Sequence, residues 1–152
     1  MGKSAKSRIR RLGFQRERAL VQSLWKLGFA CVRGPASGSK TRRVIYPDIV
    51  AMKEGTILVI EVKTSDRRKP IYIERRQVER LKEFARRAGG IPLIGVSFAD
   101  GTGWKFVRVE DLVKTRGGNY KVDDEVLAKS LSLRDLARIA DKSHKLDEYL
   151  SS

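Results

Sequence analysis

Two strand-like apolar segments near the middle of the chain each carry one acidic residue. Asp48 opens the first segment, and Glu61 lies near the end of the second, two residues before Lys63. A tight turn at 54–55 would join the segments into a hairpin in which Asp48 and Glu61 are equally far from the turn and therefore opposite each other. Cross-strand partners have Cβ atoms about 4.5–5.5 Å apart. Two carboxylates this close repel each other, so the spacing predicts a divalent cation between them, with Lys63 on the same strand face as Glu61.

The second segment is apolar on both faces. Its apolar residues are Ile57, Leu58, Val59, Ile60 and Val62. A strand buried on both sides does not carry charge without a reason. The alternative is that the acidic residues lie at solvated strand ends and do no chemistry, and a hairpin register shifted by one residue would separate them. The convergence of an aspartate, a glutamate and a lysine favours the chemical interpretation.

The chain is strongly basic. It has 33 Lys and Arg against 18 Asp and Glu in 152 residues, a formal net charge of +15 and a pI near 10.4. This balance indicates a polyanionic partner, most often nucleic acid, although ribosomal and membrane-surface proteins are also basic. With 41% hydrophobic residues the chain can bury one core. It has no apolar segment of membrane-spanning length and no signal-type segment, so we expect a soluble, intracellular protein with no membrane partner.

A helix predicted at 13–27 places Glu17 on its apolar stripe. The stripe consists of Phe14, Leu20, Val21 and Leu24. A carboxylate on a core face needs a partner, so Glu17 is a functional candidate. The alternative is a position at the edge of the stripe, from which its carboxylate reaches solvent. Residues 1–12 are basic and contain no acid, and they predict a flexible arm that follows phosphates or has no role.

The rest of the pattern predicts further elements around the hairpin. We expect strands at 29–33, 92–98 and 104–109, a helix at 74–88, and a helical pattern at 123–150. The strand at 92–98 should run parallel to the second hairpin strand after a right-handed crossover. The loop at 34–43 contains small and basic residues that can approach phosphates, with a plain mobile loop as the alternative.

This order of elements predicts the restriction-endonuclease-like fold. It is an α/β fold with an α-β-β-β-α-β core, in which a mixed central sheet is flanked by helices. Within it, Pro47-Asp48 followed by Glu61-Val62-Lys63 looks like the PD-(D/E)xK signature of that nuclease superfamily. The signature is short, and its weight here comes from its place on a hairpin, behind a helix that carries Glu17, in a basic chain.

Longer segments resemble the archaeal Holliday junction resolvases in order and spacing. They are the segments 13–18, 32–37, 47–49, 61–63, 77–84, 90–94 and 103–106. The resemblance covers roughly residues 13–110. We therefore divide the chain into a basic arm at 1–12, a nuclease domain at 13–120 and a C-terminal helical extension at 121–152, whose role is open.

The resemblance implies a set of catalytic residues. Asp48, Glu61 and the backbone carbonyl of Val62 would hold Mg²⁺, with Mn²⁺ as a substitute, because Mg²⁺ prefers oxygen ligands. Glu17 would reach the same site, directly or through water. Lys63 would orient the attacking water and offset negative charge in the transition state.

The resemblance also implies residues that bind DNA. These are Arg18, Arg33, Ser37 and Gln77, with Ser37 also expected to support catalysis, and the basic residues Lys40, Arg42 and Arg43 of the 34–43 loop join them as phosphate contacts expected from their charge. Arginine binds phosphate through two parallel hydrogen bonds, which suits this role. Gln77 is the weakest of the set, and its alternative is a surface residue at the start of a helix.

The implied function is metal-dependent, structure-specific cleavage of four-way (Holliday) DNA junctions by phosphodiester hydrolysis, in DNA recombination and repair. The family implies a homodimer, which fits a junction with two equivalent strands. The expected location is the cytoplasm, in association with the nucleoid. Two alternatives are another PD-(D/E)xK nuclease that cuts duplex DNA in repair or restriction, and a non-catalytic nucleic-acid-binding protein.

Overall fold

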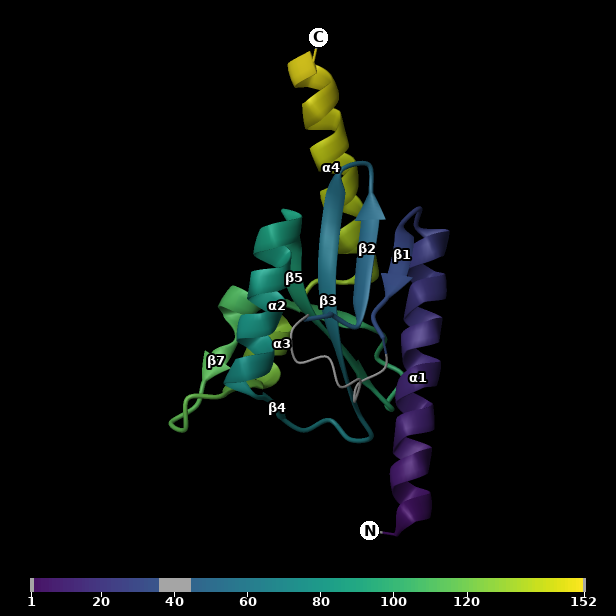
Figure 1. Cartoon of the computed structure of the whole chain (residues 1–152), viewed down its shortest axis with the longest axis vertical. Helices are drawn as coiled ribbons and strands as arrows, with labels where there is room; N and C mark the ends of the chain where they lie inside the picture. The colour runs from purple at the N-terminus through teal and green to yellow at the C-terminus, as the bar shows by residue number, and fades with distance from the viewer. Residues whose placement is uncertain (1, 36–44, 152) are drawn as a thin grey trace.

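A five-stranded mixed sheet forms the centre of the protein (Figure 1). The structure is a computed structural model that describes residues 2–35 and 45–151. In spatial order the strands are β1 (Ala30–Arg33), β2 (Ile49–Lys53), β3 (Thr56–Ser65), β5 (Ile91–Phe98) and β6 (Lys105–Arg108). Strands β3 and β5 are parallel and the other neighbours are antiparallel. The sheet confirms the predicted fold class.

Helices cover both faces of this sheet. Helix α1 (Lys3–Lys26) and helix α4 (Leu133–Ser151) pack on one face, whose core includes Leu20, Ile60 and Leu136. Helix α2 (Arg75–Ala88) packs on the other face, over β3 and β5. Figure 1 shows α1 beside β1 and the two chain ends at opposite ends of the molecule.

The hairpin has the predicted register. Ile49 pairs with Ile60 and Lys53 with Thr56, so the turn lies at residues 54 and 55. The centre of β3 is buried on both faces, as its apolar sequence predicts. The crossover helix α2 ends at Gly89, whose φ of 67° is in the left-handed region that glycine adopts without strain.

Helix α1 begins ten residues earlier than the sequence predicts. It starts at Lys3, so the basic residues expected to form a flexible arm belong to the helix. Leu20 and Leu24 are buried as predicted, but Phe14 is exposed. The reason is geometric, because the amino-terminal half of α1 extends past the sheet and has no core to pack against (Figure 1).

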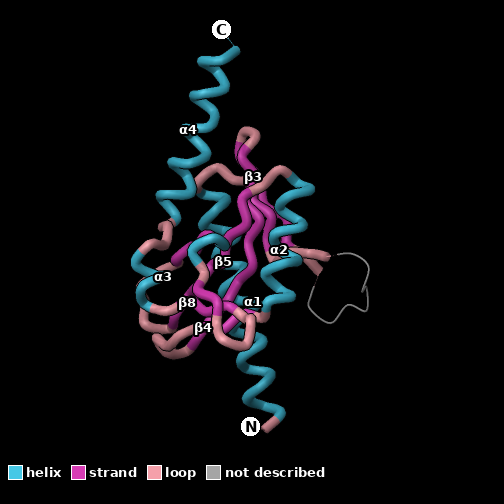
Figure 2. The backbone as a smooth tube through the Cα atoms, turned by 90° about the vertical axis from the view of Figure 1, so that its left-hand side faces the viewer, coloured by secondary structure: helices cyan, strands magenta, loops and turns pink. Residues whose placement is uncertain are grey.

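A second, small sheet was not predicted. Its three strands are β4 (Ile71–Ile73), β8 (Tyr120–Val122) and β7 (Val113–Lys114), in that spatial order. It is joined by a 3₁₀ turn, η1 (Val109–Asp111), and by the short helix α3 (Asp124–Ala128), and Figure 2 shows it beside the lower part of the main sheet. These strands have two or three residues each, too few for an alternating pattern to be visible in the sequence.

The carboxyl-terminal segment packs on the main sheet. Leu136 and Ala140 of α4 are buried in the same cluster as Phe106. Two reciprocal hydrogen bonds start α4: the backbone N–H of Asp135 donates to Ser132 Oγ at 3.1 Å, and the Ser132 N–H donates to Asp135 Oδ2 at 2.8 Å. The predicted extension is therefore divided between β8, α3 and α4, and at least the first half of α4 belongs to the core. No helix in the described part of the chain is long and apolar enough to cross a membrane.

The burial of α4 gives a stability prediction. Leu136→Ala should lower the free energy of unfolding by about 2–5 kcal/mol, because it leaves a cavity in the core. Leu150→Ala is the matched control, since Leu150 lies on the same helix and is exposed. Urea unfolding followed by circular dichroism measures both. Equal stability of the two variants would mean that α4 does not pack on the sheet.

Candidate active site at the end of the hairpin

The hairpin register brings the two predicted carboxylates together. Ile49 pairs with Ile60, and the next positions along the two strands are Asp48 and Glu61. The backbone N–H of Val62 donates to Asp48 Oδ2 at 2.7 Å, which fixes the aspartate side chain against β3. The side chains of Asp48 and Glu61 are hydrogen-bonded to each other. The structure therefore places Asp48 opposite Glu61, as the spacing predicts.

A close backbone contact positions Asp48. The Gly34 N–H donates to the carbonyl oxygen of Asp48 at 2.9 Å. A Cβ atom at residue 34 would overlap the carbonyl oxygen of Pro47, so only glycine allows the chain after β1 to approach so closely. The sequence shows Gly34 as part of a loop, and only the structure shows that it brings Arg33 next to Asp48.

The Glu61 carboxyl group lies in an environment that opposes its ionisation. Burial is the main cause, and the negative charge of Asp48 is the next, so that the pKa of Glu61 is raised to about 8 even though Lys63 lowers it. The positive charge of Lys63 is therefore not enough for both carboxyl groups to ionise. A bound cation would supply the additional positive charge.

Lys63 is held in place by a residue of helix α2. Its Nζ donates a hydrogen bond to Gln77 Oε1 at 3.0 Å. Gln77 is half-buried near the start of α2, and so it is not the surface residue of the alternative interpretation. Glu61 and Lys63 share the face of β3 on which α2 packs, because Val59, two residues before Glu61, is buried against α2.

Glu17 reaches the site from helix α1. One of its oxygens, Oε1, lies 3.8 Å from Arg33 Nη2 in an ion pair. Burial raises the pKa of Glu17, the charge of Asp48 raises it further, and the charge of Arg33 lowers it. The interaction with Asp48 shows that Glu17 lies near the carboxylate pair, whereas its direct partner is Arg33.

The structure brings together only part of the predicted set of metal ligands. Among residues 2–35 and 45–151, no three His, Cys, Asp or Glu side chains are grouped so that they could hold a metal ion together. Asp48 and Glu61 fit a hard divalent cation by chemistry, because both offer oxygen donors and the charge of Lys63 does not offset the burial and repulsion that raise the pKa of Glu61. Direct ligation by Glu17 stays a prediction.

The site opens into a surface hollow of about 610 Å³. Its lining residues are Arg10, Gly13, Phe14, Glu17, Arg33, Gly34, Pro35 and Asp48. Arg10 and Phe14 were not predicted as site residues, because their role depends on α1 extending past the sheet. Arg18 is exposed and lines an adjoining hollow. The predicted DNA-binding residues Ser37, Lys40, Arg42 and Arg43 lie outside the described residues.

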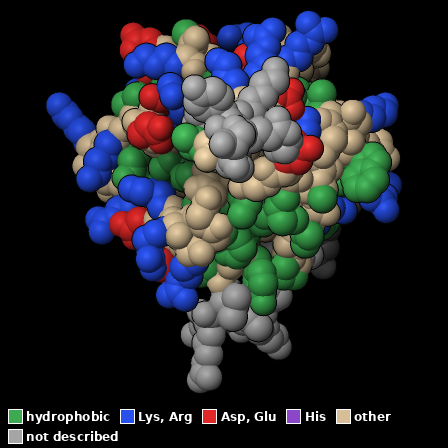
Figure 3. Space-filling view, turned by 90° about the horizontal axis from the view of Figure 1, so that it is seen from above, with side chains coloured by type: hydrophobic (Ala, Val, Ile, Leu, Met, Phe, Trp, Pro, Cys, Tyr) green, Lys and Arg blue, Asp and Glu red, His purple; other side chains and the backbone are tan. Residues whose placement is uncertain are grey.

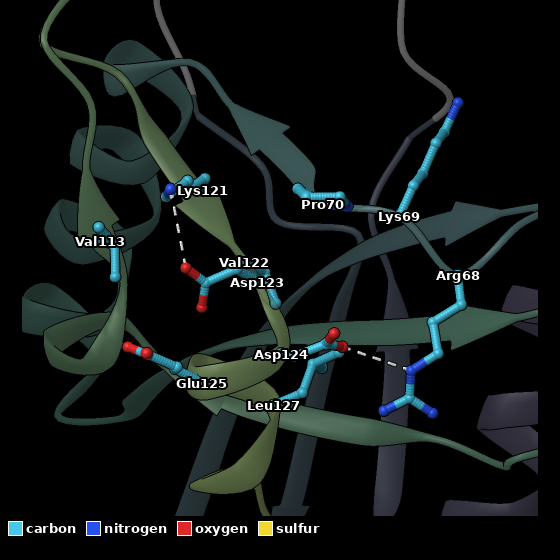
Figure 4. Close-up of a pocket in the computed structure, with 10 residues that line it drawn as sticks. All are labelled: Arg68, Lys69, Pro70, Val113, Lys121, Val122, Asp123, Asp124, Glu125 and Leu127. Carbon is cyan, nitrogen blue, oxygen red and sulfur yellow. Dashed lines mark hydrogen bonds and ion pairs between the residues drawn. The ribbon is translucent and has the colours of Figure 1, made fainter.

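Another hollow, of about 540 Å³, lies between the small sheet and α3 (Figure 4). Its charges are paired within the protein: Arg68 Nε lies 3.4 Å from Asp124 Oδ1, and Lys121 Nζ lies 3.7 Å from Asp123 Oδ2. Asp123 also caps α3 by accepting from the Val126 N–H. These pairs neutralise much of its charge, in contrast to the Asp48–Glu61 pair.

Comparisons with known proteins agree with this geometry. A family model described as archaeal Holliday junction resolvase (Hjc) matches residues 8–145. The crossover junction endodeoxyribonuclease Hjc of Sulfurisphaera tokodaii is 43% identical over 136 residues, covering 88% of this chain and 92% of the relative. The corresponding Hje protein of Saccharolobus islandicus is 36% identical, covering 80% and 93%. The solved structure of Archaeoglobus fulgidus Hjc, a Holliday junction resolvase, superposes with a TM-score of 0.76 at 34% identity, covering 82% of this chain and 99% of that one.

The mixed sheet between helices, with Asp48, Glu61 and Lys63 at the end of one hairpin, defines a nuclease of the PD-(D/E)xK class. The sequence similarity narrows the class further. The chain belongs to the archaeal Holliday junction resolvase family. The family and the fold class predicted from the sequence are both confirmed.

The raised pKa of Glu61 predicts that the stability of the metal-free protein depends on pH. Between the ordinary value of 4.5 and about 8, folded Glu61 keeps a proton that the unfolded chain has released. The free energy of unfolding should therefore fall as the pH rises through this range. Glu61→Gln should lose less stability over the same range. Thermal unfolding with a chelator at pH 5, 6, 7 and 8 measures the difference, and identical slopes for both proteins would contradict the buried pair.

Proposed function

We propose that this chain is a metal-dependent endodeoxyribonuclease that resolves four-way DNA junctions by phosphodiester hydrolysis. It acts in the cytoplasm, on the DNA of the nucleoid. The observation that carries the proposal is the facing pair Asp48 and Glu61, with Lys63 held beside it by Gln77. Membership of the family supplies the substrate, since the relatives are named crossover junction endodeoxyribonucleases.

Asp48 and Glu61 hold the Mg²⁺ ion, together with the backbone carbonyl of Val62, and Mn²⁺ can replace it. Glu17 contributes directly or through a water molecule. When bound, the ion supplies positive charge that stabilises the negative charge growing on the scissile phosphate. Arg33 holds the Glu17 carboxylate near the pair through their ion pair.

Lys63 acts on the attacking water and on the phosphate. An ammonium group has three N–H donors, and Gln77 occupies one of them in the structure. The other two are available to orient the water and to stabilise charge in the transition state. Gln77 thereby has a positioning role, and the DNA contact that the resemblance implies for it stays a prediction.

The substrate is held through its phosphates. Arg18 and Arg33 border the hollows next to the carboxylates, and Ser37, Lys40, Arg42 and Arg43 extend the basic segment after β1. Phosphate contacts position a nucleic acid without reading its sequence. Junction choice accordingly depends on shape and charge.

The protein acts as a homodimer, which presents two equivalent sites to the junction. An uncovered face of the main sheet supports this part of the proposal. Val32 of β1 pairs with Val50, and Val50 pairs with Val59, so all three lie on the face that carries α2. Val59 is buried under α2, Val50 is half-buried, and Val32 is 59% exposed.

The apolar face therefore continues beyond the area that α2 covers. Ala30 and Met52 extend it, because they pair with each other two residues away from the Val32–Val50 pair. Figure 3 views the molecule from above relative to Figure 1. It shows hydrophobic side chains gathered on one side, with Lys and Arg side chains on the flanks. An apolar patch with a charged border is typical of a protein interface.

The decisive test is a cleavage assay on a synthetic four-way junction and a matched linear duplex, with and without Mg²⁺. The wild type should cut only the junction and only with metal. Asp48→Asn and Glu61→Gln should abolish cleavage and leave junction binding intact, because each keeps the shape and removes one metal-binding charge. Equal cutting of the duplex would favour a repair or restriction nuclease, and no cutting at all would favour a binding protein.

The lysine contact gives a graded prediction. Lys63→Ala should lower the single-turnover rate by about two to three orders of magnitude, as for loss of an aligned electrostatic stabiliser. Gln77→Ala should lower it less, by about tenfold, because Lys63 keeps its charge but loses its orientation. Lys129→Ala is the control, since Lys129 is an exposed lysine at the end of α3. A wild-type rate for Gln77→Ala would show that Gln77 does not position Lys63.

The uncovered sheet face predicts where dimers form. Val32→Asp should convert the dimer to a monomer, because an aspartate side chain cannot be buried there without a partner. Val113→Asp is the matched control, an exposed valine on β7 in the other sheet. Light scattering after size-exclusion chromatography measures both masses. A dimer of Val32→Asp would place the interface elsewhere.

A further inference from the structure

A second hollow adjoins the catalytic one along helix α1. It has a volume of about 580 Å³ and shares Arg10, Phe14 and Arg33 with the catalytic hollow. Its other lining residues are Ser7, Arg11, Gln15 and Arg18. The two hollows therefore meet at Phe14, with the carboxylates on one side and a row of arginines on the other.

Phe14 is 45% exposed at this junction. Single exposed apolar residues are common on proteins and need no ligand. Phe14 differs in its surroundings, because Arg10 and Arg18 lie four residues before and after it on the same helix face. An exposed phenyl ring between two guanidinium groups forms a surface that is apolar at its centre and cationic at both ends.

Most of the arginines that line this hollow have no competing ion-pair partner among the residues whose side chains the structure describes. Arg33 forms an ion pair with Glu17, whereas Arg10, Arg11 and Arg18 form none with any of those residues. Proteins that bind nucleic acid strands combine such unpaired cations, which hold phosphates, with aromatic rings on which bases stack. A nucleic acid strand fits both parts of this surface, because its phosphates can bind the arginines and a base can stack on the phenyl ring.

We propose that Phe14 stacks on a nucleotide close to the scissile phosphate, while Arg10, Arg11 and Arg18 hold the phosphates that flank it. The subsite rests on the proposed function, since it supplies the strand that enters the catalytic hollow. Arg10 and Glu17 are seven residues apart, or about 10 Å along the helix axis. At about 3.4 Å per nucleotide of B-form strand, this distance corresponds to roughly three nucleotides.

The test compares Phe14→Ala, Phe14→Trp and Leu12→Ala. Leu12 is the matched control because it is 43% exposed on the same helix and lines neither hollow. A four-way junction carries 2-aminopurine, a fluorescent base, at one of three strand positions next to its branch point. Binding is measured without metal, by fluorescence anisotropy and by quenching of the 2-aminopurine.

Phe14→Ala should weaken junction binding about tenfold and abolish the quenching at one of these positions. Phe14→Trp should keep both, because its ring also stacks, and Leu12→Ala should match the wild type. Arg10→Ala should reduce the slope of log K against log salt by about 0.9, the value for one phosphate contact.

Two results would overturn the subsite. One is a Phe14→Ala protein that binds and quenches like Leu12→Ala. The other is a Phe14→Ala protein with an altered oligomeric mass, which would assign Phe14 to a contact between copies of the chain. If the wild type fails to cut junctions with Mg²⁺ but the Phe14-dependent quenching persists on the uncut DNA, the proposed function is wrong and the strand subsite stands. If the wild type cuts junctions but Phe14→Ala changes neither junction binding nor quenching, the strand subsite is wrong and the proposed function stands.

Discussion

The register of the β2–β3 hairpin is the constraint on which the site depends. It places Asp48 opposite Glu61 in a sheet whose centre is buried, and the Val62 N–H fixes the aspartate by a hydrogen bond of 2.7 Å. Burial and mutual repulsion then raise the pKa of Glu61 to about 8, so the pair shares a proton or requires a cation. A shift of one residue would move Asp48 relative to both Glu61 and Lys63. Strand pairing therefore sets the electrostatics of the site.

The surrounding elements complete the site from two directions. Helix α2 contributes Gln77, which holds Lys63 on the face that carries Glu61. Helix α1 contributes Glu17, and the edge strand β1 contributes Arg33, its ion-pair partner. The contact between Gly34 and the Asp48 backbone joins this second group to the first. The acidic Asp48–Glu61 pair thus lies within a chain of net charge +15, whose positive charge attracts the phosphate backbone of DNA.

The carboxyl-terminal segment, whose role the sequence leaves open, completes the core of the protein. Leu136 and Ala140 of α4 are buried against the face of the sheet that also carries Leu20 of α1. The small sheet and α3 add Ile73, Val122 and Val126 to the core on the opposite face. Both faces of β3 are closed partly by residues beyond 110, so the β2–β3 hairpin depends on this segment for its burial.

The sequence alone was sufficient for the hairpin, its register, the grouping of Asp48, Glu61 and Lys63 at the end of the hairpin, and the crossover helix, because these follow from local periodicity and turn residues. It also contained the signature of the family, which the comparisons confirm. Tertiary structure decided the rest. Gln77 meets Lys63, and Gly34 meets Asp48, only after the crossover and the edge strand are in place. Phe14 is exposed because α1 extends past the sheet, and the strands β4, β7 and β8 form because distant short segments pair. Such contacts depend on where whole elements pack, and the pattern within any single segment does not contain that information.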